Sequence, residues 1–201
     1  MNRVQALLGT ATDGAQYADG YLRYLAGVFT MIDREAIAAF VEVLLDARQR
    51  EAQIFFLGNG GSASTASHWV NDLTRWRDRP FRAISLTDNV AVMTAYANDF
   101  GYDEVFIRQL QTLMEPGAVV VAISASGNSP NVVLAVEYAN AHDAITVGLT
   151  GFGGGRLREV ASLSVHAPTN EGEYGPAEDV HMVLDHLVTS YLEHRCGQER
   201  P

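Results

Sequence analysis

The sequence predicts an α/β protein, a doubly wound three-layer sandwich with a five-stranded parallel sheet and extra helices at the N-terminus. Two observations support this. Residues from about 16 to 50 show helical spacing throughout. After them come five short runs that are apolar on both faces and are separated by helical stretches, the pattern of buried parallel strands: "IFFLG", "FRAISL", "AVVVAIS", "AITVGLT" and "LSVHAP".

The helices follow from apolar spacing and from their end signals. Asp33 is predicted to cap the second N-terminal helix. In a sheet of this kind, ligands bind beyond the carboxyl ends of the strands. We therefore expect a site in the loops that follow strands and lead into helices. Further helices are predicted near residues 62–76, 90–97, 103–114, 129–142, 154–160 and 177–195.

Length and composition describe one globular unit, taken here as a single domain over residues 1–201. Hydrophobic residues make up 47% and charged residues 19% of the chain, which is far from the composition of disordered proteins. No run is long enough to span a membrane, and the N-terminus lacks the apolar core of a signal peptide, so we expect a cytoplasmic protein. Cys196 is the single cysteine, which excludes an internal disulfide and a cysteine-built zinc site.

The charge balance bears on the ligands. The formal net charge is -10, and the chain contains no lysine, since all its basic residues are arginines or histidines. Such a chain repels nucleic-acid backbones, so nucleic-acid binding is disfavoured. An anionic substrate would have to be held by neutral hydrogen-bond donors and a few arginines.

Two glycine- and serine-rich loops follow predicted strands. The first, "GNGGSAS" over residues 58–64, lacks both the dinucleotide-binding spacing and the P-loop lysine. It can be an anion cradle at a helix start or a tight turn capped by Ser62. The second loop, in "AISASGNSPNVV", places Ser124, Ser126 and Ser129 around a Gly-Asn turn, with Pro130 at a helix start. Three hydroxyls at one helix start favour a phosphate site.

Two further stretches follow strands. Asp88, in "SLTDNVAVM", can cap the next helix. The glycines of "GFGGGRL", residues 151–157, are most simply a flexible turn.

Three segments together resemble the sugar isomerase (SIS) domain family, in its phosphoheptose isomerase branch: "GNGGSAS" with its following histidine, "AYANDFGYDEVFIRQL" and "ISASGNSPNVV". The likeness covers nearly the whole chain. It implies an aldose–ketose isomerase that converts sedoheptulose 7-phosphate into D-glycero-D-manno-heptose 7-phosphate by proton transfer between C1 and C2. It also implies a homotetramer with sites at subunit interfaces.

The resemblance also implies site residues. It assigns phosphate binding to Ser62, Ser124, Ser126 and Ser129, places Asn59 and Gly60 on the loop lining that site, and places Asp88 near the sugar-contacting segment. It implies a zinc ion, or another divalent metal, held by His68, Asp72, Glu178 and His186.

Two of these metal-site positions depart from the family pattern. Asp72 stands where a glutamate is usual, and Glu178 stands where a glutamine is usual. The segment "NEGEYGPAED" before the last helix also departs from it. His68 and Asp72 are still one helical turn apart, and Glu178 and His186 lie roughly 80° apart around their helix, so both can border one pocket.

The roles follow from the chemistry of isomerisation, which needs a base, an acid and a phosphate clamp. We expect Glu178 as the base, since the shortened Asp72 reaches less far, and His186 as the acid; the reverse assignment stays open. His142, His181 and His194 are expected to be surface or satisfied histidines, and Asp185 can be an ordinary polar residue of an amphipathic helix.

Two alternatives remain. Some relatives are tetrameric binding proteins without catalysis, including one that binds the bacterial replication initiator, and others isomerise different phosphosugars. In either case we expect the N-terminal helices to pack between subunits through an apolar face: Tyr21, Leu22, Leu25, Phe29 and Ile32.

Overall fold

The computed structural model describes residues 2–75 and 79–197. It contains a five-stranded sheet in the order β2-β1-β3-β4-β5, in which every neighbouring pair is parallel. The predicted α/β fold with its five strands is confirmed. The strands are β1 (Gln53–Gly58), β2 (Arg82–Ser85), β3 (Val119–Ser124), β4 (Ile145–Thr150) and β5 (Leu163–His166).

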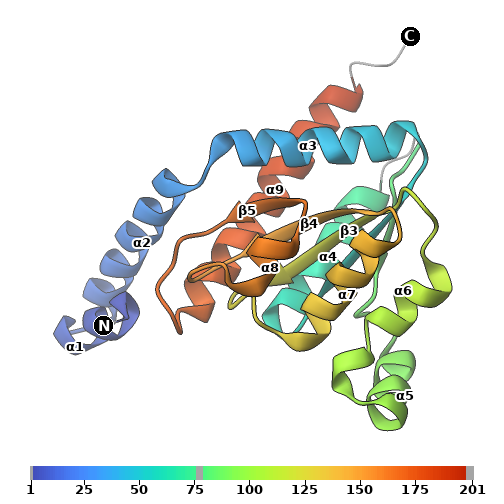
Figure 1. Ribbon diagram of the computed structural model, residues 1–201. Coiled ribbons are helices and arrows are strands. Elements are labelled where there is room, and N and C mark those ends of the chain that lie inside the picture. The colour runs from blue at the N-terminus through green and yellow to red at the C-terminus, as the bar shows by residue number, and fades with distance from the viewer. Residues whose placement is uncertain (1, 76–78, 198–201) are drawn as a thin grey trace.

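Helices cover both faces of the sheet, as Figure 1 shows. Consecutive strand side chains point to opposite faces, so Phe56 joins one core and Phe55 the other. The first core is closed by α3 (Arg34–Gln49), α4 (Gly61–Thr74) and α9 (Tyr174–Gly197). The second is closed by α6 (Ile107–Leu113), α7 (Pro130–Ala141) and α8 (Gly155–Val160), and by Val105 and Phe106, which follow η1 (Tyr102–Glu104).

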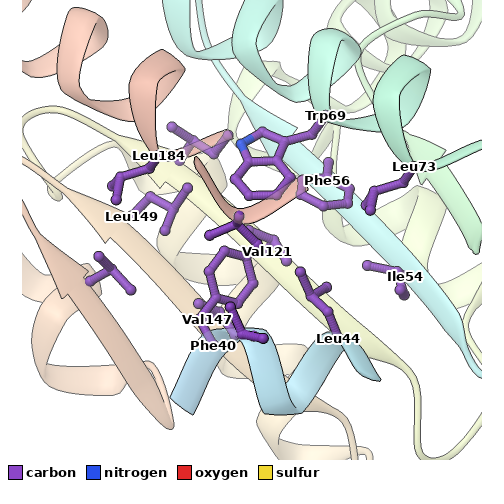
Figure 2. Packing of buried hydrophobic residues seen from close by; sticks show 14 of the residues in the cluster. Phe40, Leu44, Ile54, Phe56, Trp69, Leu73, Val121, Val147, Leu149 and Leu184 are labelled. Atoms are coloured by element: carbon purple, nitrogen blue, oxygen red, sulfur yellow. The ribbon is translucent and has the colours of Figure 1, made fainter. Parts of the chain in front are cut away.

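The first core fixes α4 and α9 against the sheet. Trp69 of α4 is fully buried, and its ring stacks on Phe56 with 5.5 Å between centroids (Figure 2). Phe40 of α3 approaches the same indole at 5.4 Å, and Leu184 of α9 lies in the same cluster. Because α4 and α9 share this core, the side chains on their outer faces are held in a defined relation.

The N-terminal region contains one helix that the sequence pattern did not predict. The predicted helices near 16–50 are α2 (Gly14–Met31) and α3, and Asp33 accepts a hydrogen bond from the Glu35 amide as the predicted cap of α3. The additional helix is α1 (Arg3–Thr10). It is short and buries no residue, and its first amides, at Arg3 and Val4, donate to the carboxylate of Glu173.

The α2 face predicted to lie between subunits is only partly free. Ile32 is 4% exposed and packs in the first core of its own chain, and Phe29 packs against that core. Leu22 and Met31 remain 65% and 59% exposed. Figure 1 shows α1 and α2 projecting from the sandwich.

Two other predictions need correction. The helix after β2 is α5 (Val90–Phe100), and its cap is Asn89, whose side chain accepts from the Val92 amide, rather than Asp88. The single helix expected over 103–114 is η1 followed by α6. The predicted end of the helix at residue 76 lies outside the described residues. None of the helices in the described part of the chain is long and apolar enough to cross a membrane.

Candidate active site

The strand order places two predicted loops side by side. From β1 the chain continues to β2, which lies toward one edge of the sheet. From β3 it continues to β4, which lies toward the opposite edge, so the direction in which successive strands are added reverses between β1 and β3. Gly58 and Ile123 pair at the ends of these strands. This switch point is where open α/β sheets bind ligands. It holds a cavity of about 130 Å³, here called the serine pocket, lined by Asn59, Ser62, Ile123, Ser124, Ala125, Ser126, Ser129, Tyr174 and Glu178.

Two serine hydroxyls of this pocket are held with their protons free. The Oγ atom of Ser124 accepts a hydrogen bond from the Gly127 amide at 3.1 Å, and that of Ser126 accepts from the Asn128 amide at 3.2 Å. A hydroxyl that already accepts retains one O–H to donate. Both serines can therefore donate to a ligand, and the ligand atom that suits them is an acceptor such as a phosphate oxygen.

Two helix starts meet at the same pocket. Gly60 and Ser129 are the N-cap residues of α4 and α7, and neither makes a side-chain cap bond to its helix. Pro130 occupies the first turn of α7. Uncapped amides and the positive end of the helix dipole favour an anion. The serine pocket thus combines hydroxyl donors with two helix N-termini, without any lysine.

The "GFGGGRL" segment packs against the loop that follows β3. A Cβ atom on Gly127, which has a φ of +67°, would lie 1.8 Å from the carbonyl oxygen of Gly154. The Leu157 amide donates to the Gly127 carbonyl at 2.8 Å. The segment, described from the sequence as a flexible turn, is therefore packed against the loop that contains Ser124, Ser126 and Ser129 and supports it. Only a glycine at position 127 leaves room for this close contact.

Glu178 reaches the pocket from α9. A Cβ atom on Gly61 would lie 2.2 Å from its Oε2 atom, so its carboxylate rests on the start of α4. The side chain of Glu178 makes no hydrogen bond or ion pair with any residue in the described ranges. Burial, and then the nearby charge of Asp179, raise the pKa of the Glu178 carboxyl above its usual value. An unpartnered carboxylate with a raised pKa suits general-base chemistry.

A second group lies between α4 and α9. The Nε2 atoms of His68 and His186 are 3.1 Å apart, and Nε2 of His68 is 3.7 Å from a carboxylate oxygen of Asp72. One ligand atom from each of the three residues lies within 4.8 Å of the others. We call these three residues the histidine cluster. Two imidazoles and a carboxylate match the donor set of a divalent metal site with an open position.

Glu178 is not part of the histidine cluster. Glu178 precedes His186 by eight residues, so the angle between the two side chains around the helix axis would allow a shared pocket. Eight residues, however, also separate the two positions by about 12 Å along the helix axis. The prediction that both side chains border one metal pocket was based on the angle alone and did not include this axial distance. In the structure Glu178 lines the serine pocket, and His186 faces His68.

Two buried groups on α9 were described wrongly from the sequence. Asp185 and His181 are both fully buried, and neither finds a hydrogen-bond partner with good geometry among the described residues. Burial, and then the charge of Asp72, raise the pKa of Asp185 to about 8, against an opposing effect of Arg75. Burial lowers the pKa of His181 to about 4. Whether a polar side chain of α9 is buried depends on how α9 packs against the rest of the protein. The residue types along the helix do not reveal this packing.

Two predicted binding residues do not line the serine pocket. Gly60 is the cap of α4 beside it. Asp88 lies at the end of β2, where its carboxylate accepts hydrogen bonds from Ser67, from Ser85 at 2.9 Å and from Thr87 at 3.1 Å. The pocket also includes Tyr174, which the sequence did not mark, although it lies in the unusual "NEGEYGPAED" segment.

Comparison with known proteins agrees with this geometry. The family model described as SIS domain matches residues 16–151. A phosphoheptose isomerase from Nitratidesulfovibrio vulgaris (strain DSM 19637 / Miyazaki F) is 38% identical over 198 residues, covering 96% of this chain and 89% of the relative. One from Bordetella avium (strain 197N) is 41% identical over 163 residues, covering 79% and 83%. A solved phosphoheptose isomerase from Neisseria gonorrhoeae matches with a TM-score of 0.81 at 29% identity, covering 90% of this chain and 96% of that one. The chain therefore belongs to the SIS domain family, in the branch of the phosphoheptose isomerases.

Proposed function

We propose that this protein is an aldose–ketose isomerase that converts sedoheptulose 7-phosphate into D-glycero-D-manno-heptose 7-phosphate. The observation that carries the proposal is the pair of hydroxyls of Ser124 and Ser126, each of which accepts from a backbone amide and keeps a proton for an anionic ligand. The names of the relatives supply the class of sugar, and the serine pocket supplies a place for its phosphate.

The phosphate clamp would orient the reacting end of the substrate. His68 follows Ser62 by six residues on α4, which corresponds to about 9 Å along the helix. An open-chain sugar phosphate held by its phosphate in the serine pocket can thus extend along α4 toward the histidine cluster. Binding energy from the remote phosphate then serves to place C1 and C2 between the two groups.

Glu178 is the proposed base. Its carboxylate, with its raised pKa and no partner in the described chain, removes a proton from C1 of the ketose and returns it to C2. His186 is the proposed acid, which exchanges a proton with the neighbouring oxygen. Asp72 is 5% exposed and lies against His68 and Arg75, a position that favours holding a cation over reaching a carbon atom.

The donor set of the histidine cluster fits a divalent metal. His68, Asp72 and His186 would hold zinc or a similar ion. When bound, such an ion polarises a carbonyl oxygen of the substrate.

The assembly we propose is a cytoplasmic homotetramer. Apolar side chains remain exposed on three helices that project or lie at the surface: Leu22 and Met31 of α2, Val90 and Phe100 of α5, and Val183, Leu187 and Tyr191 of α9. α5 buries no residue although its composition is apolar, as expected of a helix covered by another subunit. Sedimentation at micromolar concentration should give a tetramer, and a monomer would contradict this part of the proposal.

The activity is tested by incubating purified protein with sedoheptulose 7-phosphate and following the aldose by nuclear magnetic resonance. We expect turnover, together with stoichiometric zinc or activation by added zinc. Binding of sugar phosphates with no turnover on any ketose or aldose phosphate would identify a binding protein instead. Turnover on another phosphosugar alone would correct the substrate.

A further inference from the structure

Asn59, which lines the serine pocket, takes part in a hydrogen-bond network that reaches outside the pocket. Its amide forms two reciprocal bonds with the amide of Asn131 on α7, at 2.9 and 3.0 Å. The hydroxyl of Tyr102 donates to the Oδ1 atom of Asn59 at 2.9 Å. Asn131 is 1% exposed, whereas Tyr102 is 53% exposed at the end of the "NDFGY" segment.

The orientation of both amides follows from one backbone group. The Val132 N–H can only donate, and it points to Oδ1 of Asn131 at 3.0 Å. The other end of the Asn131 side chain must then be the NH₂ group, which donates to Asn59. The atom of Asn59 that faces it is therefore the oxygen, and the Tyr102 hydroxyl donates to this same oxygen.

The bonds leave Asn59 with a single polar function for a ligand. A side-chain amide has two acceptor sites and two N–H donors. Asn131 and Tyr102 occupy both acceptor sites of Asn59, and Asn131 takes one of its N–H groups. One N–H remains, on a side chain that lines the pocket.

We propose that Asn131 and Tyr102 are positioning residues, which hold Asn59 so that it offers the substrate an N–H and no acceptor. This inference rests on the proposed function, because it takes the ligand of the serine pocket to be the phosphosugar. The substrate atom next to Asn59 is then an acceptor, a phosphate or sugar oxygen, and a ligand that offers only a donor there is rejected. Tyr102 acts through Asn59 and does not itself touch the ligand.

A double-mutant cycle between Asn59→Ala and Tyr102→Phe tests this, with sedoheptulose 7-phosphate and inorganic phosphate as calorimetric probes. Tyr102→Phe should raise Kd about 2- to 10-fold, the effect of one hydrogen bond, with kcat nearly unchanged. In the Asn59→Ala background the same substitution should change nothing. Tyr138→Phe, on α7 and outside the pocket, is the matched control and should leave Kd unchanged in both backgrounds.

Asn131→Leu provides a second line of evidence, with thermal unfolding to verify that the variant folds. It should weaken binding more than Tyr102→Phe does, because it removes three of the bonds in the network. Equal effects of Tyr102→Phe in both backgrounds, or no effect in the wild-type background, would overturn the inference while leaving the proposed function intact. If the wild-type protein bound neither probe, the proposed function and this inference would fall together.

Discussion

The serine pocket and the histidine cluster are built in different ways. The serine pocket is largely local: its loops follow β1 and β3, and its serines are held by amides two or three residues away. The histidine cluster joins His68 to His186 across 118 residues and exists only because α9 docks on α4. A site made of many local donors should lose its function gradually, whereas a site made of three distant ligands should lose it at once.

The largest effect is expected where α9 enters the serine pocket. Glu178→Gln should lower kcat about 10²- to 10⁴-fold, because an amide cannot accept the proton, while KM changes little. Steady-state kinetics with sedoheptulose 7-phosphate provide the measurement. Glu171→Gln, at an exposed position in the segment that precedes α9, is the control. A rise in activity would assign the base to Asp72 and would move the chemistry wholly into the histidine cluster.

The histidine cluster is tested by removing one ligand. His186→Ala should reduce zinc affinity by more than the roughly 10- to 100-fold that loss of an outer-shell partner costs. Phosphate affinity should remain within about twofold, because the serine pocket does not share this residue. Metal content after dialysis, measured by mass spectrometry, is the readout, and His194→Ala on the same helix is the control. Full zinc occupancy in His186→Ala would show that the cluster is no metal site.

The serine pocket should respond in the opposite sense. Ser124→Ala combined with Ser126→Ala should raise the Kd for sugar phosphate about 10- to 100-fold, since hydrogen bonds to a charged group are lost. Zinc content should not change. Calorimetry of the double variant against Ser190→Ala, an exposed serine of α9, makes the measurement. Unchanged affinity would mean that the phosphate binds elsewhere.

The smallest effect concerns the docking of α9 itself. His181 is buried with its pKa lowered to about 4, whereas an unfolded chain protonates histidine near 6.5. The unfolded state therefore binds more protons between these values, and the free energy of unfolding should fall as the pH drops from about 6.5 toward 4. Between pH 6.5 and pH 5 the loss should be about 1–2 kcal/mol.

Urea unfolding with EDTA present measures this slope. His181→Leu should lack this part of the pH dependence, and the exposed His142→Gln should retain it. Equal slopes in wild type and His181→Leu would show that His181 is not held neutral, and that α9 docks less tightly than the structure indicates.

Most of the fold could be predicted from the sequence, because the patterns that mark helices and strands lie within short stretches of the chain. Apolar runs such as Val119–Ser124 must be covered on both faces, and helix starts are marked by residues such as Asp33 and Pro130. The exceptions have tertiary causes. α1 buries no residue, and its first amides are satisfied by Glu173, far away in the chain. Asn89 rather than Asp88 caps α5, because the Asp88 carboxylate is taken by hydroxyls from β2 and α4.

For the site, the sequence by itself determined the chemistry of the serine pocket. Residue type and spacing within one loop decide which hydroxyls and amides face the carboxyl end of a strand. Only the tertiary structure decided which distant side chains meet. It separated Glu178 from His186, buried Asp185 and His181, and joined Tyr102 to Asn59. The physical reason is that helix periodicity fixes directions around one axis, whereas contacts across α4 and α9 depend on how two helices pack on a shared core.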